Sequence, residues 1–104
     1  MTGLDLVAAK REAVTALCRK YAVRRLRLFG SAIRGDFDSV ASDLDFLVEF
    51  DAPVGMNAFH QFIDLKLELE ELFSRRVDLV TWKAVRDPGF RQMAEEGAVE
   101  LYAA

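Results

Sequence analysis

The sequence predicts a small α/β (α+β) domain in which a mixed β-sheet carries helices packed on one face. Two long segments repeat apolar residues at three- and four-residue steps, which is typical of amphipathic helices. Shorter segments alternate apolar and polar residues or are β-branched, which indicates strands between and after those helices. The chain has 104 residues, 52% of them hydrophobic and 30% charged, and this composition favours one soluble globular domain over residues 1–104.

The first two elements are a helix and a strand. Apolar residues recur at helical spacing from about Leu4 to Tyr21, so this segment is predicted to form one amphipathic helix. In the following stretch VRRLRLF, Leu26 and Leu28 alternate with arginines, as expected for a half-buried strand that stops at Gly30.

The second strand has the clearest pattern in the chain. From Asp43 to Phe50, every second residue is apolar and shares one face: Leu44, Phe46, Val48 and Phe50. The stretch DAPVG then interrupts regular structure with a proline and a glycine.

The remaining elements follow in the order helix, strand, short helix and a weaker element. Helical spacing predicts a helix over roughly Met56 to Phe73, and the β-branched stretch VDLVTW predicts a third strand. Asp87 and Pro88 suit the N-cap and first position of a short helix. The terminal AVELY is a weak strand or a last helical turn.

Composition also narrows the functions to consider. A net charge of −3 gives no overall field for holding a polyanion, so stable binding to nucleic acid is not expected. Charges interrupt every apolar run, which argues against a membrane span, and the N-terminus lacks the pattern of a signal peptide. The expected location is therefore the cytoplasm. The single cysteine, Cys18, is expected to pack in the core.

Three aspartates suggest a site for divalent cations. Residues two apart on a strand point the same way, so Asp43 and Asp45 project together. Asp78 would join them if the third strand lay beside the second. Oxygen-only ligands of this kind suit Mg²⁺ with a phosphate-bearing substrate. An isolated pair of this spacing is more often simply the solvent side of an amphipathic strand.

A glycine-serine turn strengthens the cation hypothesis. Gly30 allows a sharp turn and a close approach to a ligand, and main-chain N–H groups with the Ser31 hydroxyl could hold a phosphate. Arg34 follows within one turn as a fixed cation. By itself, this dipeptide is more commonly a strand-to-helix turn with a serine N-cap; its combination with SDLD downstream is the informative feature.

The stretch GSAIRGDFDSVASDLDFLVEF, followed by RRVDLVT, resembles the minimal nucleotidyltransferases of the DNA polymerase β superfamily, over nearly the whole chain. The resemblance implies a nucleotidyltransferase fold. It implies that Gly30, Ser31 and Arg34 bind the triphosphate of ATP and that Ser42 orients the acid loop. It further implies that two Mg²⁺ ions are held by a set of three catalytic acids: Asp43, Asp45 and Asp78.

Two residues depart from the pattern of that family. Ala32 stands where many members carry a basic residue, and Ser74 stands where glycine is usual before the third strand. The first departure bears on affinity for the triphosphate, and the second bears only on a turn.

Nothing in 104 residues serves as a second domain for an acceptor. Stand-alone members of this size resemble antitoxins paired with a HEPN-domain ribonuclease toxin. This resemblance implies transfer of AMP from ATP to a tyrosine hydroxyl of that toxin. Two alternatives stay open: a non-catalytic antitoxin that neutralises the toxin by binding, and a small-molecule nucleotidyltransferase. The chain permits a homodimer or a hetero-oligomer.

Other conspicuous residues have simpler interpretations. His60 has no second metal ligand at helical spacing, so a surface role is expected. Trp82 is expected to pack at an edge, although it could border a nucleotide or partner surface. Arg24, Arg25 and Arg27 are expected to form the solvent side of the first strand.

Overall fold

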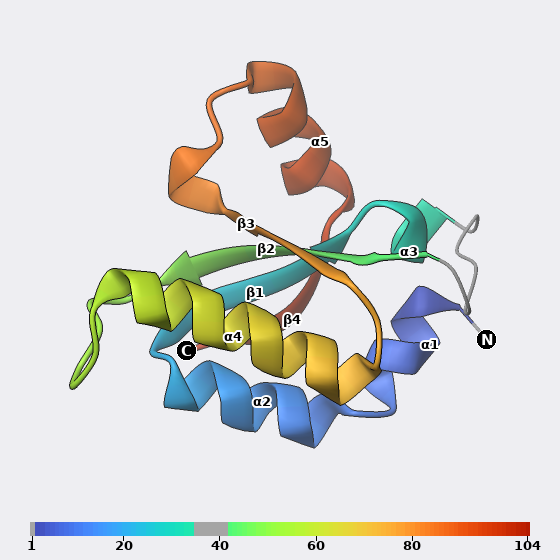
Figure 1. The fold of residues 1–104 in the computed structure, drawn as a ribbon. Coiled ribbons are helices and arrows are strands. Elements are labelled where there is room, and N and C mark those ends of the chain that lie inside the picture. The colour runs from blue at the N-terminus through green and yellow to red at the C-terminus, as the bar shows by residue number, and fades with distance from the viewer. Residues whose placement is uncertain (1, 35–41) are drawn as a thin grey trace.

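A computed structural model of the protein describes residues 2–34 and 42–104. Its sheet has the strand order β3-β2-β1-β4, and the helices lie above and below that sheet (Figure 1). The elements in chain order are α1 (Gly3–Ala8), α2 (Arg11–Lys20), β1 (Val23–Phe29), α3 (Ser31–Arg34), β2 (Leu44–Phe50), α4 (Ala58–Phe73), β3 (Val77–Thr81), the 3₁₀ helix η1 (Trp82–Ala84), α5 (Pro88–Gly97) and β4 (Val99–Ala103).

The sheet is mixed, as predicted. β1 runs antiparallel to both β2 and β4, while β2 and β3 are parallel. A parallel pair needs a crossover connection, and α4 supplies it between β2 and β3. The register places Phe29 opposite Asp45 and Asp45 opposite Asp78. Residues from three neighbouring strands therefore lie in one row across the sheet.

The main hydrophobic core lies between the sheet and the helices α2 and α4. Its fully buried members come from all of these elements and include Cys18, Leu26, Phe46, Leu65 and Leu69. Burial raises the pKa of the Cys18 thiol to about 12, because the thiolate would lose its hydration. The predicted core role of Cys18 is confirmed.

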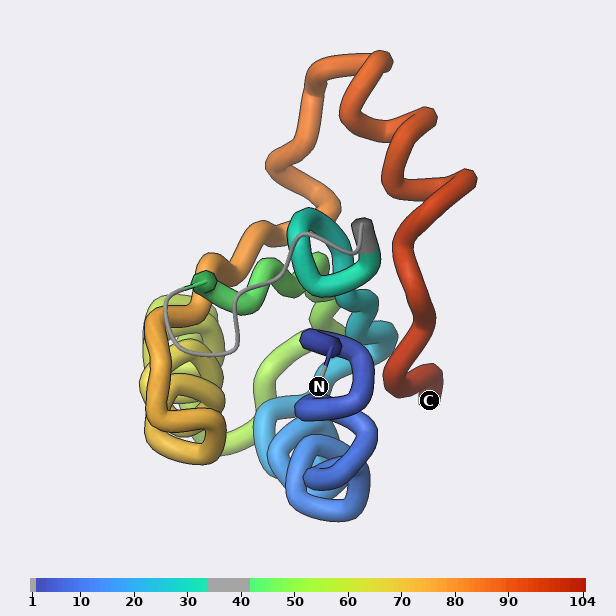
Figure 2. The backbone as a smooth tube through the Cα atoms, turned by 90° about the vertical axis from the view of Figure 1, so that its right-hand side faces the viewer, coloured from blue at the N-terminus to red at the C-terminus, as the bar shows by residue number. Residues whose placement is uncertain are grey.

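The expectation of helices on one face holds for α2 and α4, but α5 lies across the sheet from them (Figure 2). Phe29, Leu47 and Ala94 are the buried residues of this second cluster. The ring of Phe90 in α5 meets Phe29 edge-to-face, with centroids 5.4 Å apart. The α/β fold class is confirmed, with one short helix added to the opposite face.

Element boundaries differ from the predictions in a few places. The single helix expected from Leu4 to Tyr21 is divided into α1 and α2 around Ala9 and Lys10. Thr2 caps α1 in a reciprocal arrangement with Asp5. Asp87 is the N-cap of α5, as predicted, and the terminal segment is a strand.

Arg27 is not on the solvent side of β1, and that prediction is wrong. Its side chain is only 3% exposed, because α5 and η1 cover the face of the sheet to which it points. Its guanidinium lies 4.5 Å from the centre of the Trp82 ring, within the range of a cation–π contact. Burial lowers the pKa of Arg27. Arg24, in contrast, is exposed.

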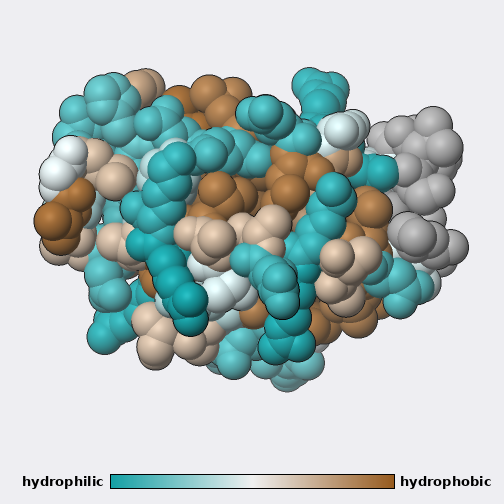
Figure 3. Space-filling model, turned by 90° about the horizontal axis from the view of Figure 1, so that it is seen from below, coloured by the Kyte–Doolittle hydropathy of each residue, from teal (hydrophilic) through white to brown (hydrophobic). Residues whose placement is uncertain are grey.

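The surface formed by α2 and α4 shows hydrophobic residues between hydrophilic side chains (Figure 3). Leu67 of α4 is 54% exposed. His60 near the start of α4 is also exposed, as expected. In the part of the chain that the structure describes, no helix has both the length and the apolar composition to cross a membrane.

Candidate active site

Gly30 directly follows β1, at a position that strongly favours glycine. Its φ of +74° lies in the left-handed region, which is unfavourable for residues with a Cβ atom. A Cβ atom added to Gly30 would lie 2.2 Å from Oδ2 of Asp45. The carboxylate of Asp45 is therefore seated directly against the backbone of the turn.

Asp45 and Asp78 lie side by side on neighbouring strands. They are partners in the parallel register of β2 and β3, so their side chains leave the same face of the sheet. Asp45 is partly buried and Asp78 is exposed. The sequence alone only suggested that Asp78 lies near Asp45. The strand order, with β3 beside β2, places the two residues next to each other.

Asp43 precedes β2 by one residue and is exposed. The residue before it, Ser42, is partly buried, and its carbonyl accepts a hydrogen bond of 3.1 Å from Nη1 of Arg75. The backbone N–H of Leu44 donates to the carbonyl of Arg76 at 3.1 Å. These two bonds tie the approach to β2 to the segment that leads into β3. Sequence reasoning missed the role of Arg75, because nothing local links it to Ser42.

The turn after Gly30 continues into α3. Ser31 begins this four-residue helix and is partly buried, and the N–H of Ile33 donates to the Gly30 carbonyl at 3.2 Å. Ala32 is buried in the main core, so a long basic side chain at this position would have to point out of the core. Arg34 ends α3, and its side chain lies outside the described residues.

The start of β3, which carries Asp78, is held by the end of α4. A carboxylate oxygen of Glu70 accepts a hydrogen bond of 3.0 Å from the N–H of Val77. This bond lowers the pKa of Glu70, because it favours the charged carboxylate. Ser74 ends α4 with a φ of +52°, the conformation in which glycine is usual.

The structure does not gather the three aspartates around one point. Among residues 2–34 and 42–104, no three His, Cys, Asp or Glu side chains are gathered closely enough to hold a metal ion. Asp43 and Asp78 are exposed, whereas Asp45 is partly buried. Two carboxylates about 6 Å apart repel by about 3 kcal/mol at an effective dielectric near 20. A divalent cation would offset this repulsion.

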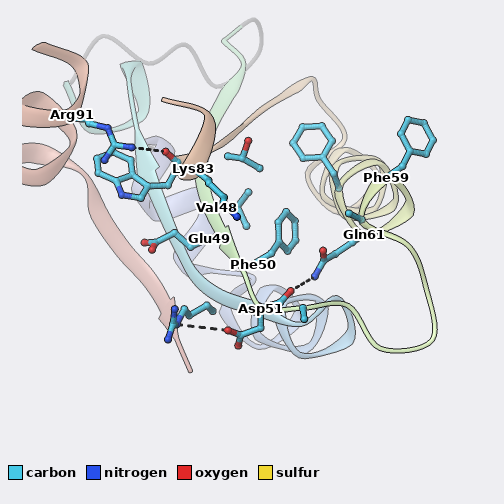
Figure 4. A pocket seen from close by; sticks show the side chains of 14 residues that line it. Val48, Glu49, Phe50, Asp51, Phe59, Gln61, Lys83 and Arg91 are labelled. Carbon is cyan, nitrogen blue, oxygen red and sulfur yellow. Dashed lines mark hydrogen bonds and ion pairs between the residues drawn. The ribbon is translucent and has the colours of Figure 1, made fainter. Parts of the chain in front are cut away.

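A large pocket of about 1080 Å³ lies elsewhere and contains none of the aspartates named above. It is formed around the ends of β2 and β3, with α4 on one side and η1 and α5 on the other (Figure 4). Sequence reasoning missed it, because its lining comes from segments that are far apart in the chain. Trp82, the residue that the sequence suggested as a possible border of a nucleotide or partner surface, lines this pocket.

A family model for the nucleotidyltransferase domain matches residues 10–101. The chain belongs to the nucleotidyltransferase domain family. The matched residues include the glycine-serine turn and all three aspartates.

Curated relatives agree with this assignment. MntA of Thermococcus cleftensis, named a protein adenylyltransferase, is 39% identical over 75 residues, which are 72% of this chain and 68% of that protein. MJ1379 of Methanocaldococcus jannaschii, provisionally named a protein adenylyltransferase, is 35% identical over 80 residues, which are 77% of this chain and 78% of that protein.

Solved structures share the fold. A structure assigned as a minimal nucleotidyltransferase aligns with a TM-score of 0.75 at 36% identity and covers 95% of each chain. A chain from the complex of a tri-AMPylated Shewanella oneidensis HEPN toxin with its MNT antitoxin aligns with a TM-score of 0.64. That alignment covers 93% of this chain and 72% of the other at 19% identity, so it concerns the fold of the nucleotidyltransferase alone.

Proposed function

We propose that this nucleotidyltransferase is an antitoxin that transfers AMP from ATP to a tyrosine hydroxyl of a HEPN-domain partner toxin. The observation that carries the proposal is the register that places Asp78 beside Asp45, next to the Gly30 turn. Relatives named protein adenylyltransferase support a protein acceptor. The fold shared with a chain of a complex containing an AMPylated HEPN toxin supports the class of partner.

The residues have separate tasks in the proposed reaction. Backbone N–H groups after Gly30 and the Ser31 hydroxyl would hold the triphosphate, with Arg34 as a further cation. The three aspartates would hold two Mg²⁺ ions. Bound there, these ions would neutralise charge on the phosphates and lower the pKa of the acceptor hydroxyl.

The transfer step is a substitution at the α-phosphorus of ATP. A bond forms between the tyrosine oxygen and this phosphorus, and the bond to the bridging oxygen breaks. Pyrophosphate leaves with the electron pair, and the hydroxyl proton is lost to solvent with the help of Asp78. Holding both reactants in line supplies much of the rate enhancement of such a step.

The test begins with the gene beside that of this chain: if it encodes a HEPN-domain protein, as the proposal expects, that protein is analysed by intact-mass spectrometry after incubation with ATP and Mg²⁺. We expect the partner to gain the mass of one or more AMP groups, located on tyrosine by fragmentation. Asp45→Asn should abolish the gain while the variant still binds the partner. An unmodified partner in the presence of the wild-type chain contradicts the proposed activity.

A double variant separates chemistry from simple occlusion. If Asp43→Asn with Asp45→Asn still neutralises the toxin in cells, binding alone is sufficient for the antitoxin effect. If neutralisation is lost while the circular dichroism spectrum is unchanged, the transfer reaction is required.

A further inference from the structure

The pocket of about 1080 Å³ lies where β2 extends beyond its neighbour. The last pair between β2 and β3 joins Val48 to Thr81, so Glu49 and Phe50 continue β2 without a partner in β3. After Thr81 the chain turns into η1 and leaves the sheet. The result is an open groove with the end of β2 along its floor (Figure 4).

One wall of the groove is apolar and comes from the beginning of α4. Phe59 and Phe62 line it together with Phe50 of the floor. Phe59 is 67% exposed, which is costly for a side chain of this size unless another surface covers it. Gln61 fixes this end of α4, because its amide donates to the carbonyls of Tyr21 at 2.8 Å and Asp51 at 3.0 Å.

The opposite wall is basic and comes from η1 and α5. Arg91 donates to the carbonyls of Val85 at 2.8 Å and Trp82 at 3.2 Å. Its guanidinium also lies 4.4 Å from the centre of the Trp82 ring. These contacts hold the arginine in place without neutralising it. Lys83 is exposed beside it.

The acidic residues of the groove are already engaged. Asp51 pairs with Arg24 at 3.7 Å, and Glu49 pairs with Arg25 at 3.8 Å and with Arg27 at 3.7 Å. Lys83 and Arg91 of the basic wall are not the partners in these pairs, although the chain as a whole carries a net charge of −3. A ligand that complements both walls has carboxylates on one side and apolar side chains on the other.

We propose that this groove docks an acidic segment with aromatic or aliphatic side chains on the partner protein that receives AMP. This inference rests on the proposed function. The floor residues Val48 to Phe50 lie three to five positions along β2 from Asp45, or roughly 10–17 Å at about 3.3 Å per residue. A partner held in the groove can thus present a hydroxyl at the aspartates without covering the nucleotide site.

The groove is tested by measuring the affinity of the chain for its HEPN-domain partner by isothermal titration calorimetry. Phe59→Ser and Lys83→Glu should each raise the Kd about tenfold or more, since exposed aromatic and charged anchors dominate such interfaces. The KM for the partner should rise in the transfer assay, with kcat little changed at saturating partner.

Two matched variants control for changes that are not specific to the groove. Leu67→Ser removes another apolar side chain of the same helix, which is 54% exposed. Lys10→Glu reverses the charge of another exposed lysine. Both should bind the partner within about threefold of the wild-type Kd, a difference of less than about 0.7 kcal/mol. The increase in melting temperature caused by ATP and Mg²⁺ should be the same in all four variants.

The possible results separate this inference from the proposed activity. If the wild-type chain modifies the partner while Phe59→Ser and Lys83→Glu bind it normally, the groove proposal is wrong and the activity stands. If neither variant changes partner binding but both dissociate a homodimer in sedimentation velocity, the groove is covered by a second copy, which also overturns the proposal. A wild-type chain that binds the partner through the groove but leaves it unmodified refutes the activity alone.

Discussion

Replacing Gly30 by alanine should slow AMP transfer on the order of 100-fold while leaving the chain folded. The added Cβ atom would lie 2.2 Å from Oδ2 of Asp45, whereas non-bonded contacts of this kind are normally above about 3 Å. The carboxylate or the turn must therefore move by about 1 Å. A displacement of this size in catalytic geometry costs on the order of 100-fold in rate.

Gly55→Ala is the matched control for the backbone conformation. Gly55 has a φ of +77°, close to the +74° of Gly30, but an added Cβ atom at Gly55 would meet nothing within 4 Å. Both substitutions should destabilise the fold by about 1–2 kcal/mol, because each places a Cβ atom in the left-handed region. Only Gly30→Ala should also lower the transfer rate on the order of 100-fold.

The assay combines AMP transfer to the partner, followed by mass spectrometry, with urea denaturation of each variant. Rates are compared at a temperature and urea concentration at which all variants are folded. A Gly30→Ala chain that transfers AMP within about threefold of the wild-type rate would refute the reasoning, because the carboxylate would then tolerate the displacement. If Gly55→Ala lost as much activity as Gly30→Ala, the loss would be caused by backbone strain and not by contact with Asp45.

Three further predictions concern stability and reactivity. Ser74→Gly should stabilise the chain by about 0.5–1 kcal/mol, since glycine adopts the φ of +52° without strain. The melting temperature should rise by several degrees, and an unchanged melting temperature would contradict this prediction. Glu70→Gln should cost about 1 kcal/mol at pH 7. Because the pKa of Glu70 is lowered in the folded chain, this difference in stability should be fully present above the ordinary pKa of 4.5. It should disappear as the pH falls through the folded pKa. Urea denaturation between pH 3 and 7 measures the difference, and a difference that does not depend on pH would argue against a role for the carboxylate charge. Cys18 should resist alkylation by iodoacetamide at pH 8 in the native chain, since burial raises its pKa to about 12, and react rapidly in urea; rapid labelling without denaturant would show that the core is open.

The sequence was informative where patterns are local. Alternation from Asp43 to Phe50 correctly predicted a strand, which the structure begins one residue later at Leu44, and the capping residue Asp87 correctly marked the start of α5. The position of Asp78 needed the strand order, because pairing between β2 and β3 depends on how α4 crosses the sheet. The expectation that Asp78 joins the other two aspartates therefore came from the resemblance to a family, and not from the alternation of residues.

Other features could not be predicted because they depend on what covers a surface. Alternation indicated which face Arg27 points to, but not that Trp82 and α5 would bury that face. α3 has only four residues, too few for a helical repeat to be recognised. The groove combines α4 with η1 and α5, so no single segment carries a signal for it.

The proposed activity requires Asp43, Asp45 and Asp78 to meet around divalent cations beside the Gly30 turn. The most direct measurement is anomalous scattering from crystals grown with Mn²⁺ and a non-hydrolysable ATP analogue. We predict Mn²⁺ peaks within about 2.5 Å of carboxylate oxygens of all three aspartates, with the triphosphate against residues 30 and 31. Mn²⁺ bound elsewhere, with Asp78 directed away from Asp45, would contradict the account.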